Sequence, residues 1–276
     1  MPHQLALLTV VYENYQVLDD FLRSLEKQTN RHFELFIADA SAHKKKLTSN
    51  ALPVTKLSIA NRGYAYAINI ALKEAIKKGL DNFCVLNDDT QLSDNFVEKA
   101  IDVLQKHKNT LIGGKIYYAP GYEYHKNRYR QEEKGKVIWY AGGRIEWSQV
   151  LTLHLGVDEV DAGQFARPGK TEFITGCLVC FDKKVVDKIG FWDENYFLYY
   201  EDADYCLKAK NAGIDLYYDP QLIIWHKHAQ STQGSGSKLH EHYQKLNQLR
   251  FGLKYAPWKT KVHLLKNYLG AKLLGR

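Results

Sequence analysis

Two clusters of carboxylates lie next to apolar segments, where side chains of this kind could bind a ligand. The first, Asn87-Asp88-Asp89, directly follows Phe83–Leu86, an apolar run that favours a strand buried on both faces of a sheet. Ligands of open α/β sheets bind outside the carboxyl ends of the strands. Adjacent carboxylates repel each other unless positive charge lies nearby. The cluster therefore indicates either a divalent cation that holds a phosphate or a polar turn before a helix with Ser93 as N-cap.

The second cluster consists of Glu201, Asp202 and Asp204, and it follows the aromatic-rich segment 191–200. A helix is expected to begin at this cluster and to end at Asn211. Acidic residues in the first turn of a helix suit the helix dipole. A functional interpretation is also open, because an aromatic wall raises the proton affinity of a carboxylate that faces a cleft, which suits a general base.

Strands and helices alternate through the first 107 residues. Apolar runs predict strands at 5–12, 33–38, 55–60 and 82–86. Apolar residues at helical spacing predict helices at 15–28, 64–78 and 93–107. This alternation predicts a parallel, doubly wound sheet in an α/β fold. Two of the strands end next to carboxylates, Asp39 and Asp89, so the same edge of the sheet is the expected ligand site.

The pattern changes after Leu111. Polar loops are expected at 121–136 and 158–170. Short apolar segments predict antiparallel additions to the sheet at 137–140, 144–147 and 151–155. The remaining expected elements are a helix at 182–189 and strands at 173–181, 216–218 and 222–225, the last followed by His226. The expected architecture is a Rossmann-like mixed sheet flanked by helices.

The composition is ordinary for a globular protein, with 45% hydrophobic and 25% charged residues among 276. No apolar run approaches the roughly 20 residues that span a bilayer, and the N-terminus lacks the features of a signal peptide. Four cysteines are interpreted as reduced core residues of a cytosolic protein: Cys84, Cys177, Cys180 and Cys206. The net charge of +7 favours an anionic partner.

Basic residues are concentrated after Lys238, where two helices are expected on either side of Pro257. Apolar residues accompany the lysines of the second helix. A basic amphipathic helix can lie on an anionic membrane surface. Packing against the rest of the chain with a solvated basic face explains the pattern equally well.

The motifs, in this order and spacing, resemble the inverting family 2 glycosyltransferases of GT-A fold, in particular the rhamnosyltransferase-like bacterial enzymes of surface-polysaccharide synthesis. The resemblance covers roughly residues 4–232 and rests on Val10-Val11-Tyr12, Asp39, Asn61-x-Gly63 with Asn69, Asn87-Asp88-Asp89, Gly176, Phe191-x-Asp193-Glu194, Glu201-Asp202-x-Asp204 and His226. The chain departs from the family's Asp-x-Asp motif, because Asn87 replaces the first Asp.

The resemblance implies roles for particular residues. Contacts with the nucleotide-sugar are implied for Tyr12, Glu13, Asp39, Asn61, Gly63, Asn69, Asp88 and Glu201. A Mn²⁺ or Mg²⁺ site is implied for Asp89 and His226. The role of catalytic base is implied for Asp202, and contacts with the acceptor are implied for Gly176, Trp192 and Asp193. Asp204 lies about 200° from Asp202 around a helix, at roughly 100° per residue, so it is expected to contribute only helix-start charge.

The residue types suit sugar transfer. Displacing a nucleoside diphosphate builds negative charge on the leaving oxygens, which a cation neutralises. A carboxylate removes the proton of the attacking acceptor hydroxyl. The expected organisation is a catalytic domain at 1–235, with a nucleotide-sugar half (1–115) and an acceptor half (116–235), followed by a basic helical extension at 236–276.

The expected partners are a dTDP- or UDP-linked sugar donor and a glycan or lipid-linked acceptor, with no nucleic acid. A homodimer and peripheral contact with the inner face of the cytoplasmic membrane are further expectations for this cytoplasmic protein. One alternative is a nucleotidylyltransferase, which requires a Gly-rich basic phosphate loop after the first strand, where this chain has Tyr12-Glu13-Asn14-Tyr15. The other is a non-catalytic basic module that binds glycan or nucleic acid, for which a carboxylate at Asp202 has no use.

Overall fold

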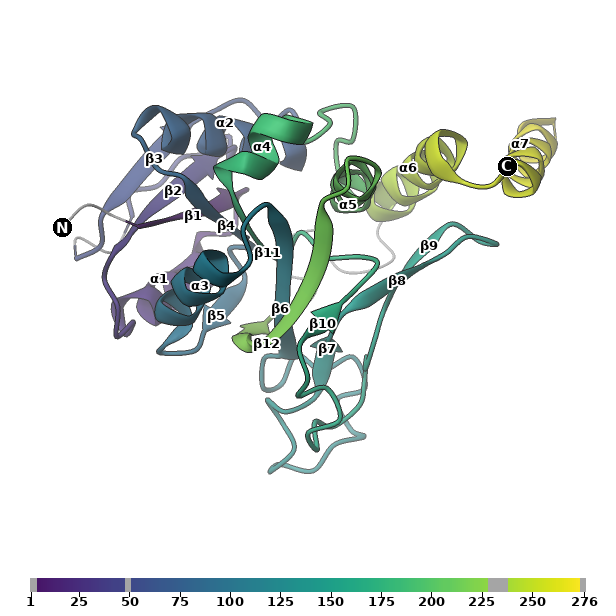
Figure 1. Cartoon of the computed structure of the whole chain (residues 1–276). Helices are drawn as coiled ribbons and strands as arrows, with labels where there is room; N and C mark the ends of the chain where they lie inside the picture. The colour runs from purple at the N-terminus through teal and green to yellow at the C-terminus, as the bar shows by residue number, and fades with distance from the viewer. Residues whose placement is uncertain (1–3, 48–50, 228–237, 274–276) are drawn as a thin grey trace.

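Four parallel strands form the N-terminal half of a mixed sheet in the computed structural model, which describes residues 4–47, 51–227 and 238–273. In spatial order they are β4 (Asn82–Leu86), β1 (Leu5–Val11), β2 (Phe33–Asp39) and β3 (Val54–Ser58). The helices of this half are α1 (Tyr15–Glu26), α2 (Tyr64–Lys77) and α3 (Phe96–Lys106) (Figure 1). The predicted alternation of strands and helices is confirmed here. Strands β4, β1 and β2 are buried apolar runs, whereas β3 at the edge of the sheet is only partly buried, and each helix buries one apolar face.

The other half of the sheet is mixed. It continues from β4 through β11 (Leu178–Asp182), β6 (Thr110–Tyr118), β12 (Asp215–His226) and β10 (Gly169–Lys170). Strand β11 is antiparallel to β4, whereas β6 and β12 are parallel to each other. Two short strands pair at its margin, β5 (Thr90–Leu92) with β12 and β7 (Ile138–Tyr140) with β6.

The predicted start of the third helix at Ser93 is wrong. Residues 90–92 form β5 and pair with β12, so the helix begins only at Phe96, with Asn95 at the N-cap position. Ser93 instead accepts a hydrogen bond from Phe96 N through its backbone oxygen, at 3.0 Å. Pairing with a distant strand therefore takes precedence over a local capping signal.

Strand β6 is central in the structure but has no counterpart among the predicted elements. Gly113 and Gly114 interrupt its apolar pattern, and glycine in a strand marks a close approach of another backbone. A Cβ atom on Gly114 would lie 2.3 Å from the carbonyl oxygen of Leu222 in β12. Gly114 therefore allows β12 to approach β6 closely, and the two glycines together hide the strand pattern in the sequence.

Three further boundaries differ from expectation. The strands predicted at 216–218 and 222–225 are one strand, β12, with a register irregularity between Asp219 and Ile223. The strand predicted at 173–181 begins later, at Leu178. Strands β8 (Gly143–Glu146) and β9 (Leu151–His154) form a separate two-stranded sheet instead of extending the main one.

The helices predicted in the second half of the chain are present. Helix α4 (Lys183–Ile189) follows β11, and α5 (Glu201–Asn211) begins at the second carboxylate cluster. The two C-terminal helices are α6 (Lys238–Tyr255) and α7 (Trp258–Leu273), and Figure 1 shows α6 beside α5 with α7 extending away from the body of the protein. The predicted domain boundary at 235/236 lies outside the described residues.

All four cysteines are free and buried, as predicted. Within the described part of the chain, no helix has the length and apolar character needed to cross a bilayer.

Candidate active site at the carboxyl edge of the sheet

Asp89 and His226 lie far apart in the sequence but meet at the edge of the sheet. Strand β5 runs antiparallel to the end of β12, which places Thr90 opposite His226. Lys227 N donates a hydrogen bond to the backbone oxygen of Asp89 at 2.8 Å. His226 Nε2 lies 3.1 Å from Asp89 Oδ1, and both side chains are almost fully buried. Trp139 packs edge-on against the imidazole, with ring centroids 4.5 Å apart.

The donor atoms at this edge fit a divalent cation. A carboxylate oxygen and an imidazole nitrogen are ligands that Mn²⁺ and related ions accept. Burial, together with the charge of Asp89, raises the pKa of Asp88 well above its ordinary value. A cation bound beside the two carboxylates would offset their mutual repulsion. Within the described residues, no cluster of three or more His, Cys, Asp or Glu assembles as a metal site. If Asp89 and His226 hold an ion, its remaining ligands would come from phosphate oxygens and water.

The second cluster presents Asp202 at the start of α5. Gly176 N donates to Asp202 Oδ2 at 2.9 Å, and Ala203 N donates to Oδ1 at 2.8 Å. Burial raises the pKa of Asp202 above its ordinary value, and these N–H donors only partly oppose the shift. Burial and the charge of Asp202 raise the pKa of Glu201 further. A mostly buried carboxylate with a raised pKa is the type of group that serves as a general base.

Tyr64 connects the two clusters. Its hydroxyl lies 3.0 Å from Asn87 Oδ1 and 3.2 Å from the backbone oxygen of Gly176. Gly176 is also the residue whose N–H holds Asp202. Burial raises the pKa of Tyr64 well above its ordinary value, and the charges of Glu201, Cys177, Asp202 and Asp88 add to this effect. Both carboxylate clusters therefore lie around one tyrosine, a residue that the sequence pattern did not single out.

Asp39 is fully buried at the end of β2. It lies 2.8 Å from Lys56 Nζ and accepts hydrogen bonds from Tyr15 Oη at 2.6 Å and Ser41 N at 3.1 Å. Burial raises the pKa of Asp39, but the hydrogen bonds from Lys56, Tyr15 and Ser41 prevail and hold it below its ordinary value. The carboxylate is thus ionised and held at the sheet edge, and its contact with a nucleotide stays a prediction.

The other residues predicted to bind the nucleotide-sugar differ in exposure. Tyr12 is exposed, and the carboxylate of Glu13 accepts a 2.6 Å hydrogen bond from Ala42 N. Asn61 is exposed and accepts a 3.3 Å bond from Gly63 N. Asn69 is buried, where it exchanges hydrogen bonds with the backbone of Trp192 at 2.9 and 3.0 Å. The amide of Asn69 therefore holds the segment around Trp192, and a nucleotide contact by any of these residues stays a prediction.

Gly63 permits a close contact between the two halves of the molecule. Its φ is +103°, and a Cβ atom there would lie 2.6 Å from the backbone oxygen of Phe197. We expect Gly63→Ala to lower the free energy of unfolding by about 2–4 kcal/mol, measured by denaturant unfolding. Gly79→Ala is the matched control, because Gly79 also has a positive φ but open space around it. Equal losses in the two variants would contradict the close-contact explanation.

The three residues predicted to bind the acceptor differ in their contacts. Trp192 is buried and stacks on Tyr205, with ring centroids 4.9 Å apart and an interplanar angle of 15°. Gly176 lies against both Asp202 and Trp192. Asp193 accepts hydrogen bonds from Asn195 and lies 3.3 Å from Lys254 Nζ, so its carboxylate is engaged within the protein. Acceptor contacts stay a prediction for all three.

The comparison with protein families decides where the chain belongs. Residues 3–241 match the family model described as glycosyltransferase like family 2. The chain is a member of this family. The resemblance that the motifs indicated is thereby confirmed.

Relatives of this family 2 glycosyltransferase agree with the assignment. The dTDP-rhamnosyl transferase RfbF of Shigella flexneri is 24% identical over 166 residues, which are 60% of this chain and 49% of RfbF. The chain thus spans about half the length of this curated relative. The similarity places it near a rhamnosyltransferase, as the resemblance implied.

Solved structures confirm the GT-A fold. The crystal structure of GalNAc-T7 with UDP, GalNAc and Mn²⁺ matches with a TM-score of 0.64 at 18% identity, covering 89% of this chain and 48% of GalNAc-T7. The mannosyltransferase PcManGT of Pyrobaculum calidifontis, in complex with GDP-Man and Mn²⁺, matches with a TM-score of 0.58 at 13% identity, covering 96% and 69% of the two chains.

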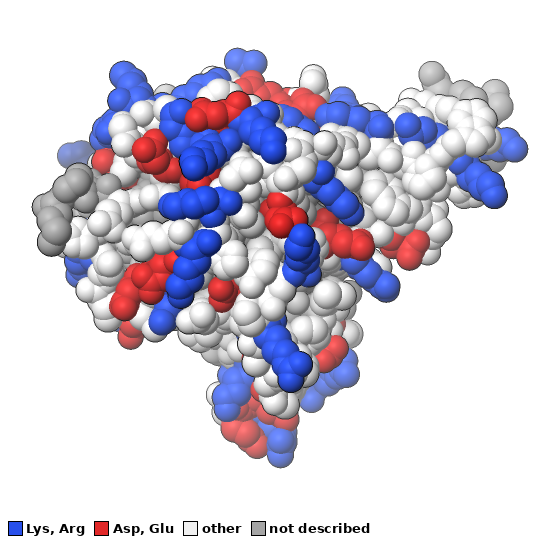
Figure 2. Space-filling model, viewed as in Figure 1, with Lys and Arg blue, Asp and Glu red and all other residues white. Residues whose placement is uncertain are grey.

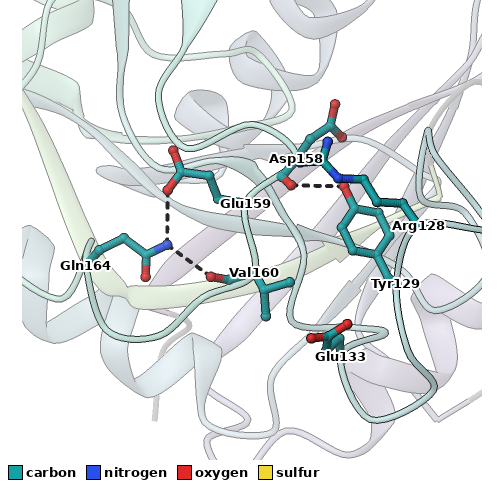
Figure 3. Close-up of a pocket in the computed structure, with 7 residues that line it drawn as sticks. All are labelled: Arg128, Tyr129, Glu133, Asp158, Glu159, Val160 and Gln164. Atoms are coloured by element: carbon teal, nitrogen blue, oxygen red, sulfur yellow. Dashed lines mark hydrogen bonds between the residues drawn. The ribbon is translucent and has the colours of Figure 1, made fainter.

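The glycosyltransferase also has a polar pocket outside the predicted site. It is lined by Arg128, Tyr129, Glu133, Asp158, Glu159, Val160 and Gln164 (Figure 3). Two of its side chains donate hydrogen bonds to backbone oxygens: Tyr129 Oη donates to Asp158, and Gln164 Nε2 donates to Val160. None of the lining residues belongs to the two carboxylate clusters, so this hollow is separate from the candidate active site.

Proposed function

We propose that the chain transfers a sugar, with inversion, from a nucleotide-diphosphate sugar to a hydroxyl of a growing cell-surface glycan or lipid-linked oligosaccharide. The observation that carries this proposal is the hydrogen-bonded path from Asn87 through Tyr64 and Gly176 to Asp202. The path joins an edge suited to a cation and a diphosphate to a carboxylate suited to a base. The proposed mechanism uses both parts: one neutralises the leaving diphosphate and the other accepts the proton of the acceptor hydroxyl.

The geometry gives Asp202 a specific task. Its carboxylate accepts the proton of the acceptor hydroxyl as that oxygen attacks the sugar carbon. The N–H groups of Gly176 and Ala203 hold the carboxylate in place. The raised pKa makes the carboxylate a stronger base than an exposed aspartate. Asp89 and His226 would hold the cation, which supplies charge neutralisation to the departing diphosphate when bound.

The donor is proposed to carry dTDP or UDP. Similarity to RfbF favours dTDP-rhamnose, whereas GalNAc-T7 was solved with UDP. The test is a screen of nucleotide-sugars for thermal stabilisation with and without Mn²⁺, because a ligand that binds only the folded state raises the apparent stability. The anomeric configuration of the product, determined by NMR, then tests inversion. Retention of configuration, or the absence of any stabilising nucleotide-sugar, would contradict the proposal.

The nucleotidylyltransferase alternative fits the structure poorly. Such an enzyme requires backbone and basic donors for phosphate after the first strand. After β1 the chain instead places an acidic side chain, Glu13, whose carboxylate accepts hydrogen bonds from Ala42 N and His43 N in the segment that follows β2.

The two C-terminal helices differ in how they contact the rest of the chain. Helix α6 packs on the domain through its buried residues Asn247 and Phe251. Helix α7 leaves Trp258 76%, Leu265 43% and Tyr268 49% exposed. Figure 2 shows Lys and Arg at the margins of a largely uncharged surface over these helices. We extend the proposal to peripheral contact of α7 with an anionic membrane, where a lipid-linked acceptor would be presented. The homodimer stays a prediction.

Replacing Trp258, Leu265 and Tyr268 together with Ser should lower binding to phosphatidylglycerol-containing vesicles by about tenfold or more. Each large apolar side chain contributes about 1.5–3 kcal/mol when it leaves water completely. Cosedimentation with the vesicles measures the effect. The matched control replaces the exposed Leu239 and Leu246 of α6 with Ser. Equal losses in the two variants, or none in either, would exclude a specific role for α7.

A further inference from the structure

Helix α6 lies mostly beyond the part of the chain that matches the family model, which ends at residue 241. It nevertheless contacts the segment that leads into Glu201 and Asp202. We name this segment, residues 193–200, the aromatic turn. Asn247 of α6 is fully buried, and its Nδ2 lies 2.8 Å from the backbone oxygen of Leu198 and 3.2 Å from that of Tyr199.

The aromatic turn has a backbone conformation that needs support. Tyr199 and Tyr200 have φ angles of 68° and 69°, so two successive residues with side chains adopt the left-handed region. This conformation is disfavoured for such residues and persists only where surrounding contacts hold it. The two carbonyl groups that accept from Asn247 belong to the residues just before and within this pair.

Further contacts from α6 surround the same turn. Phe251 packs on Tyr200 with ring centroids 5.5 Å apart, and it stacks on Trp147 at 5.8 Å. Arg250 donates to the backbone oxygen of Asn195. Its Nη1 also donates to Asn247 Oδ1 at 2.8 Å, which orients the amide so that Nδ2 faces the turn.

An ion pair ties α6 to the helix that carries the proposed base. Lys254 Nζ lies 2.6 Å from Asp204 Oδ1 in α5 and 3.3 Å from Asp193 Oδ2 in the aromatic turn. Asp204 is fully buried, and breaking a buried ion pair is strongly destabilising, so this contact fixes α5 against α6. Asp204 thus connects α5 to α6 and does more than add charge at a helix start, which was its expected role.

We infer that Asn247 is a positioning residue for Asp202. By holding the carbonyl groups of Leu198 and Tyr199, it keeps the left-handed pair in place and so fixes where α5 begins. The carboxylate of Asp202, in the first turn of α5, is thereby kept against Gly176 N. Helix α6 therefore supports the active site, although most of it lies beyond the residues that match the family model. The inference rests on the proposed function.

The test compares three variants. Asn247→Ala removes both donated hydrogen bonds. Asn247→Asp has nearly the same shape and keeps the bond from Arg250, but it cannot donate to the turn. Asn267→Ala is the matched control, because Asn267 is an exposed asparagine of α7 whose Nδ2 contacts only His263 among the described side chains.

Both substitutions at Asn247 should lower kcat for sugar transfer by roughly tenfold to hundredfold, since small misplacements of a reacting group have effects of this size. Thermal stabilisation by UDP or dTDP with Mn²⁺ should be unchanged, because the nucleotide half is not altered. Asn267→Ala should match the wild type in both measurements. A wild-type kcat in Asn247→Asp, or a parallel loss of nucleotide binding, would overturn the inference.

Hydrogen exchange makes the test independent of the proposed function. Asp204 N donates to Tyr200 O at 2.9 Å, so its exchange rate reports on the start of α5. The amides of residues 200–205 should exchange faster in both variants at Asn247, with unchanged exchange in the central strands β1 and β4. Unchanged exchange at 200–205 would overturn the inference. If the wild type turns over no nucleotide-sugar, the proposed function fails while this measurement still decides the role of Asn247.

Discussion

Replacing Asp202 with Asn should lower kcat for sugar transfer by about 10²–10⁴-fold, the usual contribution of a positioned general base. Asparagine keeps the size of the side chain and one acceptor for the N–H groups of Gly176 and Ala203, but it cannot take a proton. Thermal stabilisation by UDP or dTDP with Mn²⁺ should persist, since Asp89 and His226 are untouched. Initial rates at saturating donor and acceptor provide the measurement.

The pH dependence of transfer provides a second signature of Asp202. Burial raises its pKa, so transfer should decline as the pH falls through this raised value, at higher pH than for an ordinary aspartate. The residual activity of Asp202→Asn should lack this decline. Asp187→Asn is a suitable control, because Asp187 is an exposed residue that pairs with Lys183 on α4. Full transfer activity in Asp202→Asn would show that another group is the base, whereas no transfer by the wild type with any nucleotide-sugar would favour the non-catalytic binding module.

Replacing Asp89 with Asn should abolish the Mn²⁺-dependent part of the stabilisation by UDP or dTDP and lower kcat by at least about 10²-fold. The magnitude follows because a bound cation supplies several kcal/mol of charge stabilisation at a departing group. The amide removes the anionic ligand beside His226 Nε2 and leaves the backbone contact with Lys227 intact. Thermal melts with nucleotide alone and with nucleotide plus Mn²⁺ separate the stabilisation by the nucleotide itself from the part that depends on Mn²⁺.

Asp94→Asn is the matched control for Asp89→Asn, because Asp94 is an exposed aspartate only five positions along the chain. Chelation of divalent ions with EDTA should reduce the wild type to the behaviour of Asp89→Asn and leave that variant unchanged. A nucleotide effect in Asp89→Asn that still depends on Mn²⁺ would show that the ion binds elsewhere.

Local patterns in the sequence determined much of the N-terminal half of the chain. Strands β1, β2 and β4 are apolar runs, and helices α1 and α2 repeat apolar residues at helical spacing, so burial by nearby elements is visible in short segments. The same reasoning placed α5 at Glu201–Asn211. The order of the polar motifs between these elements was sufficient to indicate the family.

Only the tertiary structure decided how distant segments meet. Strand β5 has three residues and forms because β12 offers an edge, and this pairing brings Asp89 to His226. The roles of Tyr64 and Asn247 were invisible in the sequence, because each depends on carbonyl groups more than 45 positions away. Periodicity records whether a residue is buried, whereas the partner that buries it is set by the packing of the whole chain.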